Sequence, residues 1–338
     1  MIDLQLFKDM LGFDSTSGSE LLVSQFLEKR IASSAPVAPE VRSWDLEDGS
    51  RNLFFSWGRP AVVFCTHMDT VPPYIAPRIE GDRIWGRGTC DAKGQIMAMF
   101  TACCKLLDEG LDGFGLLLVS GEETGSWGAK AFARVPFQAP YLIVGEPTEN
   151  KMVSASKGTK SFALTFRGEP FHSGYPQFGY SAVEAFTDFV NALRAVSFEE
   201  DPILGATTWN IGELASPNPQ NVLSPELKCR VYFRTTFVSD SRVAALIPHW
   251  AENGESKWQK AMTAEAVGGD APASYLTLPG FESAPVSFGS DAPHLGNFEH
   301  KIICGPGSIR FAHRSDEHID IPELEKAVEL YAAMFKAL

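Results

Sequence analysis

The chain has 338 residues, of which 44% are hydrophobic and 21% charged, an ordinary composition for a globular protein with room for two domains. Its formal net charge of −13, with no compensating basic tract, argues against a nucleic-acid or anionic-membrane partner. No apolar run approaches the roughly 18 residues of a membrane span, and the six cysteines form no CxxC pair, so we expect a cytoplasmic protein without a disulfide framework.

The first 150 residues are expected to alternate helices and strands. An acidic amphipathic helix opens the chain, where a signal peptide would have a basic segment and an apolar core. Three later segments have the apolar spacing or the capping residues that indicate helices, and three short apolar runs are typical of buried strands. This alternation predicts an α/β domain with a mostly parallel sheet. The predicted helices are 21–33, 91–110 and 126–135, and the predicted strands are 61–66, 115–120 and 141–145.

The pattern changes near residue 156, where 160–168 alternates polar and apolar residues like a half-exposed strand. The order that follows is β-α-β-β-α-β, which indicates a ferredoxin-like arrangement. Its later elements are a helix at 181–196, strands at 207–214 and 227–236, a helix at 241–253 and a strand within 258–267. After residue 270 the α/β style returns with 285–291, 301–307 and a closing helix at 321–338. We therefore expect a catalytic domain at 1–155 and 265–338, interrupted by an inserted α+β domain at 156–264.

Acidic and imidazole side chains follow the ends of the predicted strands. Ligands of open parallel sheets gather at this edge, outside the carboxyl ends of the strands. Taken singly, such residues are ordinary loop residues, helix caps or solvated pairs, but here they come after several strand ends at once. Together they predict a metal site, and the residues concerned are His67, Asp69, Asp91, Glu122, Glu123, Glu146 and His313.

The stoichiometry of these side chains suits two divalent ions. One ion would take His67 and Glu146, the second would take His313 and Glu123, and Asp91 would bridge them together with a water. Each shell then has the four nitrogen and oxygen ligands that zinc favours. Three anionic ligands against two dications leave net positive charge, which lowers the pKa of a bridging water.

Five motifs resemble the M20 family of dinuclear zinc hydrolases, in the right order and along the whole chain. They are "THMDTVPP", "IWGRGTCDAKGQ", "SGEETGSWGA", "GEPT" and "GPGSIRFAHRSDEHI". Within that family they look most like the acetylornithine deacetylases and succinyl-diaminopimelate desuccinylases. The resemblance implies two zinc ions, with cobalt as an alternative, and a cis peptide bond after Asp91. It also implies Asp91 as the bridging ligand and His67, Glu123, Glu146 and His313 as the remaining ligands. Asp69 would not bind a metal itself but would accept the second ring N–H of His67.

The roles of Glu122 and Glu123 differ, since neighbouring side chains on an extended backbone point opposite ways. With Glu123 on a metal, Glu122 is free to act as general base and to return the proton to the leaving amine. A zinc ion and a hydrogen-bond donor would hold the developing oxyanion.

The inserted domain is expected to act as a lid and a dimer interface. By resemblance, His172 matches a lid histidine that reaches the active site of the partner subunit, so we expect a homodimer. Asn221 and Arg234 match lid residues that hold the substrate carboxylate, and Arg suits that task through bidentate pairing. Lys157 lies where some desuccinylases carry an arginine for a distal carboxylate. Without the resemblance, His172 is an ordinary loop residue and Arg234 a surface strand residue.

We therefore expect an amide hydrolase that removes an acetyl or succinyl group from an amino acid such as ornithine, citrulline, lysine or diaminopimelate, in amino-acid biosynthesis. The alternative is a dipeptidase or carboxypeptidase that uses the same metals on short peptides. Glu146 argues only against aminopeptidases, which tend to carry Asp there. A catalytically inactive ligand-binding homologue is disfavoured because all five ligands and Glu122 are present.

Overall fold

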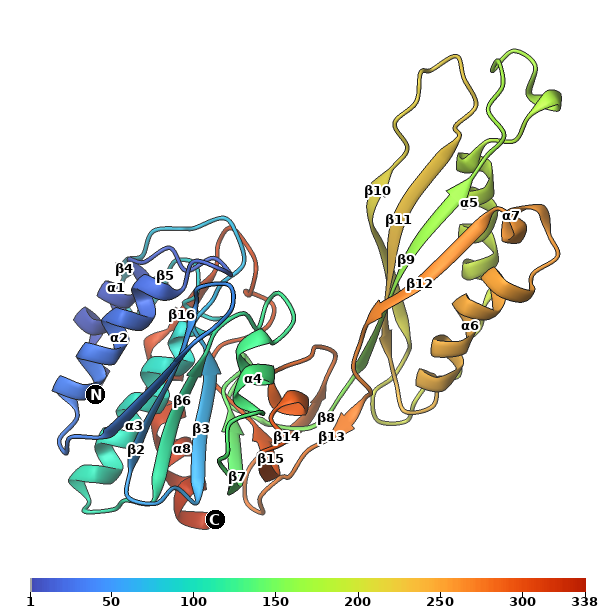
Figure 1. Ribbon diagram of the computed structural model, residues 1–338. Helices are drawn as coiled ribbons and strands as arrows, with labels where there is room; N and C mark the ends of the chain where they lie inside the picture. Colours follow the sequence, from blue (N-terminus) through green and yellow to red (C-terminus); the bar gives the residue numbers. More distant parts are fainter. Residues whose placement is uncertain (1) are drawn as a thin grey trace. The chain divides into compact units, whose positions relative to one another are not determined.

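The computed structural model describes residues 2–338, which form two compact units (Figure 1). The first unit runs to Ser154 and includes Tyr275–Ala284 and Ser290–Leu338, whereas the second comprises Ala155–Ser274 and Pro285–Gly289. The second unit is therefore an insertion into the first. The boundary expected at 264/265 falls inside strand β12 (Met262–Gly268), which belongs to the second unit because it pairs with β9 (Gly158–Arg167).

A six-stranded sheet forms the centre of the first unit. Its order is β1-β2-β6-β3-β7-β15, and β6, β3, β7 and β15 are parallel, whereas β1, β2 and β6 pair antiparallel. The sheet is thus mixed, with the predicted parallel strands forming most of it and an antiparallel pair at one edge. The hairpin of β1 and β2 is not among the predicted strands, and its edge strand is largely exposed and charged. The bounds are β1 Glu40–Asp45, β2 Arg51–Trp57, β3 Val62–His67, β6 Phe114–Val119, β7 Ala139–Val144 and β15 Phe298–Ile303.

Helices cover both faces of this sheet, because successive strand side chains point to opposite faces. Four helices share one hydrophobic core with one face, in which Phe7, Phe64 and Tyr331 are fully buried. On the other face, Phe132 of the short helix α4 (Trp127–Phe132) packs against Phe54 of β2. The four core helices are α1 Leu4–Leu11, α2 Leu21–Ser34, α3 Lys93–Asp108 and α8 Ile321–Ala337.

Two small sheets complete the connections. One has the order β16-β5-β4, and the other has the order β13-β8-β14. The segment 285–291 therefore adds no strand to the main sheet, since β14 ends at Val286 and belongs to the second of these small sheets. The bounds are β4 Arg78–Glu80, β5 Arg83–Trp85, β16 His318–Asp320, β8 Met152–Ser156, β13 Ala273–Ser274 and β14 Ser283–Val286.

The second unit has a four-stranded antiparallel sheet of order β10-β11-β9-β12, with α5 and α6 on one face (Figure 1). This order agrees with the β-α-β-β-α-β pattern of the sequence. The stretch 258–267 is only partly strand, since its first residues form the short helix α7 (Lys257–Lys260), which a capping box at Ser256 starts. The other bounds are α5 Ala182–Ala195, β10 Thr208–Ala215, β11 Glu226–Thr235 and α6 Asp240–Asn253.

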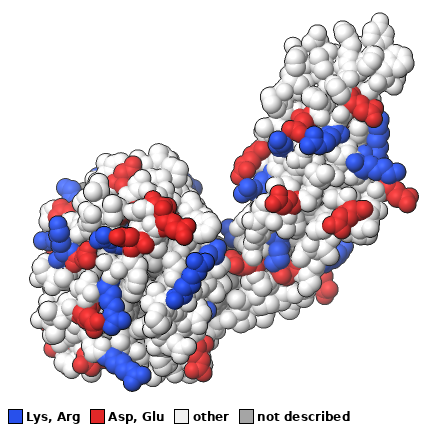
Figure 2. Space-filling view, viewed as in Figure 1, with Lys and Arg blue, Asp and Glu red and all other residues white. Residues whose placement is uncertain are grey.

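Within residues 2–338, no helix is both long enough and apolar enough to span a membrane. On the face shown in Figure 2, basic and acidic side chains are interspersed over each unit.

Candidate metal centre

The carboxyl ends of three parallel strands deliver acidic and imidazole side chains to one edge of the main sheet. His67 is the last residue of β3, Glu122 and Glu123 follow β6, and Glu146 follows β7. Because β6, β3 and β7 are neighbours and parallel, these ends meet at the same edge. Two further segments complete the site, namely the turn that carries Asp91 before α3 and the loop that carries His313 before β16.

Asp91 lies between the two imidazoles. Its Oδ1 is 3.1 Å from Nε2 of His67, and its Oδ2 is 3.3 Å from Nε2 of His313. The same His313 nitrogen is 2.9 Å from Oε1 of Glu123. Among residues 2–338, donor atoms of His67, Asp91 and Glu123 all lie within 4.8 Å of one another. The peptide bond after Asp91 is cis, as the resemblance implies.

Asp69 supports this cluster from behind. The Nδ1 atom of His67 is 3.0 Å from the backbone oxygen of Asp69 and 3.3 Å from its Oδ1. The carboxylate also accepts the backbone N–H groups of Glu122 and Glu123, each at 3.1 Å, and the hydroxyl of Ser17 at 2.8 Å. A single side chain thus orients one ligand and the loop that carries the two glutamates. Ser17 is not among the predicted site residues.

The two imidazoles carry raised pKa values because carboxylates surround them. Burial alone would lower the pKa of His67, but Asp69 and Asp91 outweigh it and raise the pKa well above its ordinary value. Asp91 and Glu123 raise the pKa of His313 to about 10. Protonation of both rings is therefore favoured in the metal-free chain, where it balances the charge of these carboxylates.

Glu146 is a buried carboxylate of the site, and Glu122 is a partly buried one. Burial raises the pKa of Glu122 well above its usual range, and the charges of Asp291, Glu123 and Asp91 raise it further. Burial likewise raises the pKa of Glu146, and Glu122 and Asp91 add to the shift. Several anionic groups thus share one poorly solvated volume, which is costly without cations.

These residues fit a pair of divalent ions. Imidazole nitrogens and carboxylate oxygens are the donors that zinc takes in its catalytic sites. The surplus of buried carboxylate charge is the electrostatic condition in which dications are favoured. Glu146 lies close enough to perturb the site electrostatically, although its oxygens are outside the 4.8 Å donor set formed within residues 2–338.

Asp291 is a buried neighbour of the site and is not among the predicted site residues. Its side chain is almost fully buried, and burial raises its pKa to about 6, while the charge of His67 opposes that rise. Its Oδ1 has no hydrogen-bond partner within residues 2–338. In the sequence, Asp291 is the last residue of the segment 285–291, and this position could have suggested a residue at a strand end. The segment is not a strand of the main sheet, however.

The structure divides the four predicted residues of the second unit between two ends of its sheet. Arg234 pairs with Thr159 at the end where the chain enters the unit, and Lys157 lies just before β9. The Nζ atom of Lys157 donates to the backbone oxygen of Ala206, and burial together with Arg234 lowers its pKa. The two cations are therefore neighbours.

His172 and Asn221 lie at the opposite end of that sheet. The backbone N–H of Ser173 donates to the backbone oxygen of Asn221 at 2.9 Å, so the two loops run side by side. His172 is exposed, and its Nδ1 accepts the N–H of Gly174 at 3.1 Å. Strands β9 and β11 are ten residues each, which separates this pair from Lys157 and Arg234 by roughly 30 Å within the unit.

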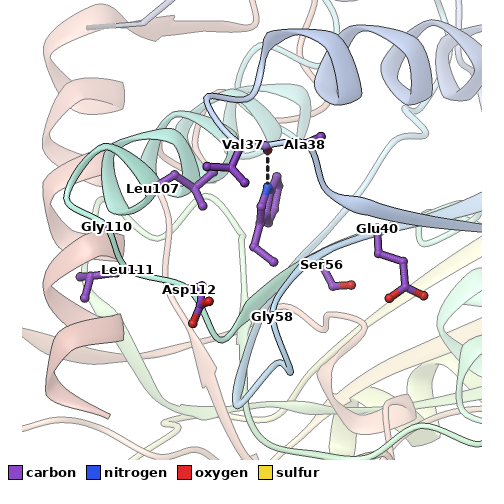
Figure 3. A pocket seen from close by; sticks show the side chains of 10 residues that line it. Val37, Ala38, Glu40, Ser56, Gly58, Leu107, Gly110, Leu111 and Asp112 are labelled. Carbon is purple, nitrogen blue, oxygen red and sulfur yellow. Dashed lines mark hydrogen bonds between the residues drawn. The ribbon is translucent and has the colours of Figure 1, made fainter.

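A cavity of about 530 Å³ lies elsewhere in the first unit (Figure 3). Its lining includes Ser56 and Trp57 at the end of β2 and Leu107 at the end of α3. The indole N–H of Trp57 donates to the backbone oxygen of Val37, drawn as the dashed line in Figure 3. Because β2 runs antiparallel to β6, this is the edge of the sheet opposite the metal ligands.

Comparison with known proteins shows which family this chain belongs to. The profile of peptidase family M20/M25/M40 matches residues 63–337. A peptidase M20 domain-containing protein of Schizosaccharomyces pombe is 32% identical and aligns over 98% of this chain and 83% of its own. A probable carboxypeptidase of Aspergillus niger is 31% identical over 99% of this chain and 89% of its own. The solved structure of a tripeptidase from Staphylococcus aureus shares the fold, with a TM-score of 0.80 at 19% identity over 100% of this chain and 99% of that chain.

These relatives do not support the expected closeness to acetylornithine deacetylases and desuccinylases. The two aligned proteins bear the names of a peptidase and a carboxypeptidase. The motifs of the metal centre do not separate these subgroups, because they carry the shared chemistry and not the recognition of the acyl group.

Proposed function

This chain belongs to peptidase family M20/M25/M40 and is a hydrolase of that family, and on this premise we propose that it is a dinuclear metallopeptidase of the carboxypeptidase or dipeptidase type. The observation that carries the proposal is the position of Asp91 between His67 and His313, with Glu123 against the second ring. That arrangement suits a carboxylate that bridges two cations, each of which has its own imidazole.

His67, Asp91 and Glu146 would hold one ion, and His313, Asp91 and Glu123 the other. Zinc is the metal that this donor set favours, with cobalt as a substitute. When bound, such ions polarise a carbonyl and make water acidic enough to attack it near neutral pH.

Glu122 is the group that moves the proton in this proposal. Its carboxylate is held beside the ligands because its backbone N–H is anchored to Asp69 at 3.1 Å. A positioned carboxylate with a raised pKa accepts a proton from the attacking water and returns it to the departing amine.

The substrate is proposed to be a short peptide with a free C-terminal carboxylate. Relatives that carry the name carboxypeptidase support this class, and Glu146 is the residue that carboxypeptidases and deacylases have in common. Arg234 would pair with the substrate carboxylate through two parallel hydrogen bonds. Asn221 lies beside His172 at the other end of the unit, so it would contribute its amide donor only from the partner subunit of the dimer proposed below.

A second candidate is the hydrolysis of an N-acyl amino acid. The observation that favours it is the proximity of Lys157 to Arg234, whose charge adds to the lowering of the Lys157 pKa by burial. Two neighbouring cations suit a substrate with two carboxylates, such as an N-succinyl amino acid. An acidic dipeptide has the same pair of charges, so only a substrate panel separates the two candidates.

We further propose a homodimer formed through the second unit, in which His172 serves the partner's site. β10 is one of the two edge strands of that sheet and could pair with its copy about a two-fold axis. His172 is exposed and lies at the end of the sheet opposite to the end where the chain enters the unit. A partner subunit could contact it there. The imidazole would donate a hydrogen bond to the developing oxyanion.

The experiment that tests the function is a turnover assay of the zinc-loaded protein. The panel contains C-terminally free dipeptides, their C-terminal amides, and N-acetyl and N-succinyl amino acids. The proposal expects turnover of the free dipeptides, a large loss with the amides, and no activity after chelation. Preference for N-acyl amino acids would select the second candidate, and activity that survives chelation would reject the metal centre.

A further inference from the structure

Glu317 is a buried carboxylate that has no place among the metal donors described above. It lies four residues after His313, and its side chain is fully buried. Its Oε1 accepts the backbone N–H groups of Gly88, Cys90 and Asp91 at 2.9, 3.0 and 3.2 Å. One oxygen thus holds the whole turn that ends in the bridging carboxylate.

These three N–H groups converge because of the conformation of the turn. Gly88 has φ of +85°, and a Cβ atom there would come within 3.0 Å of Thr70 and 3.1 Å of Lys93. Successive backbone N–H groups in such a turn form a concavity that binds anions. Here the anion is a side chain of the same protein, and hydrogen bonds to a charged acceptor are about twice as strong as neutral ones.

Arg87 completes the arrangement from the other side. Its Nη1 donates to Oε2 of Glu317 at 2.6 Å and to the backbone oxygen of Arg314 at 3.1 Å. The backbone N–H of Gly86 donates to the backbone oxygen of Glu317 at 3.0 Å. The segment that carries His313 and the segment that carries Asp91 are therefore tied together by one buried ion pair and its hydrogen bonds.

Glu317 is not itself free to bind a metal, because both of its oxygens are engaged by donors. A buried ion pair is also a weak source of stability, since the cost of desolvation offsets its attraction. What the pair does determine is geometry, namely where Asp91 and His313 lie relative to each other.

We propose that Glu317, held by Arg87, is a positioning residue that keeps Asp91 between His67 and His313 and so sets how tightly the centre holds its second metal ion. This inference rests on the dinuclear centre proposed above. The ion at His313 is the more sensitive one, because the His313 side chain is 50% exposed whereas that of His67 is 1% exposed. An exposed ligand depends more on the placement of its neighbours.

The test is a titration of chelator-treated, full-length protein with Co²⁺, followed by visible absorption and by competition with a chelator. Wild-type protein should bind two Co²⁺ ions. Glu317→Gln keeps the size of the side chain but replaces the charged acceptor, and the dissociation constant of the second ion should rise about 10- to 100-fold, as for other groups that orient metal ligands. The absorption of the second ion should change in intensity or position.

A second variant separates positioning from the effect of an unpaired charge. Glu317→Gln leaves Arg87 buried without its partner, which can prevent folding. The double variant Glu317→Gln with Arg87→Gln removes both charges and should fold, yet it should still show weaker binding of the second ion. Asp240→Asn is the matched control, because it breaks the partly buried pair with Lys160 in the second unit and should leave both Co²⁺ affinities unchanged.

The possible results separate the role of Glu317 from the dinuclear metal centre on which it rests. If wild-type protein binds fewer than two Co²⁺ ions, the dinuclear centre is wrong. If wild-type protein binds two ions and the folded variants do so with equal affinity, the centre stands and the role of Glu317 is rejected. If neither Glu317 variant folds whereas Asp240→Asn does, Glu317 serves folding and the inference is likewise rejected.

Discussion

The carboxylate of Asp69 accepts the backbone N–H of Glu122 at 3.1 Å, while its Oδ1 also lies 3.3 Å from Nδ1 of His67. A metal ligand and the proposed general base are therefore oriented by one side chain. Asp69→Asn turns an amide N–H toward groups that are themselves donors, so we expect activity and metal affinity to fall about 10- to 100-fold. Ser17→Ala, which removes one hydrogen bond to Asp69, should have a smaller effect in the same metal titration and assay. Equal effects of the two changes would contradict this account.

Glu122→Gln and Glu123→Gln should separate proton transfer from metal binding. Glu122→Gln is expected to keep both ions and to lose turnover by a factor on the order of 10² to 10⁴, the usual contribution of a positioned acid–base group. Glu123→Gln should lose an ion, because Glu123 faces His313 at 2.9 Å. Metal analysis and kcat measured on the same samples test the assignment. The reverse pattern would show that the roles are exchanged.

The stability of the metal-free protein should depend on the charge of His313. Its pKa is raised from 6.5 to about 10 by Asp91 and Glu123, so protonation stabilises the folded state. This contribution is fully present below pH 6.5 and is lost as the pH rises through about 10. The melting temperature of chelator-treated wild-type protein should therefore fall as the pH rises through that window. The melting temperature of the His313→Gln variant should fall less. Parallel pH profiles of the two proteins would count against the predicted ion pairs.

Arg234 and Lys157 should contribute to substrate binding in different ways. Arg234→Met should raise KM for every substrate with a C-terminal carboxylate, and Arg234→Lys should restore little, because a lysine cannot pair bidentately. Lys157→Met should raise KM only for substrates with a second carboxylate. Arg230→Met is the matched control, since Arg230 lies four residues earlier on β11, is 44% exposed and pairs with Glu213. A uniform loss across the panel with Lys157→Met would remove that residue from recognition.

Subunit complementation tests the proposed dimer. His172→Ala should lower turnover without a change in metal content, and Glu122→Ala should be inactive. Mixed and refolded chains of these two variants would contain heterodimers with one complete site, so part of the activity should return. His249→Ala, which changes an exposed histidine of α6, serves as the control for refolding. Absence of recovered activity despite demonstrated subunit exchange would show that His172 does not act across the interface.

The sequence alone was sufficient for the parallel core and for the set of candidate ligands. Apolar runs mark β3, β6 and β7, and because parallel strands end at one edge, the pattern alone groups the residues that follow them. It was not sufficient for the hairpin of β1 and β2, whose edge strand lacks an apolar run. Nor did it separate peptidase from deacylase relatives, because the metal motifs carry only the chemistry that both share.

Only the tertiary structure decided which groups support the ligands. Glu317 contacts the turn at Gly88, which is 229 residues away in the sequence, and Ser17 contacts Asp69, which is 52 residues away. No local sequence pattern could predict either contact. The division of Lys157 and Arg234 from His172 and Asn221 likewise follows from the register of β9 and β11. The physical reason is that a strand end is a local property of the sequence, whereas the partner of a buried charge depends on which distant segments the fold brings together.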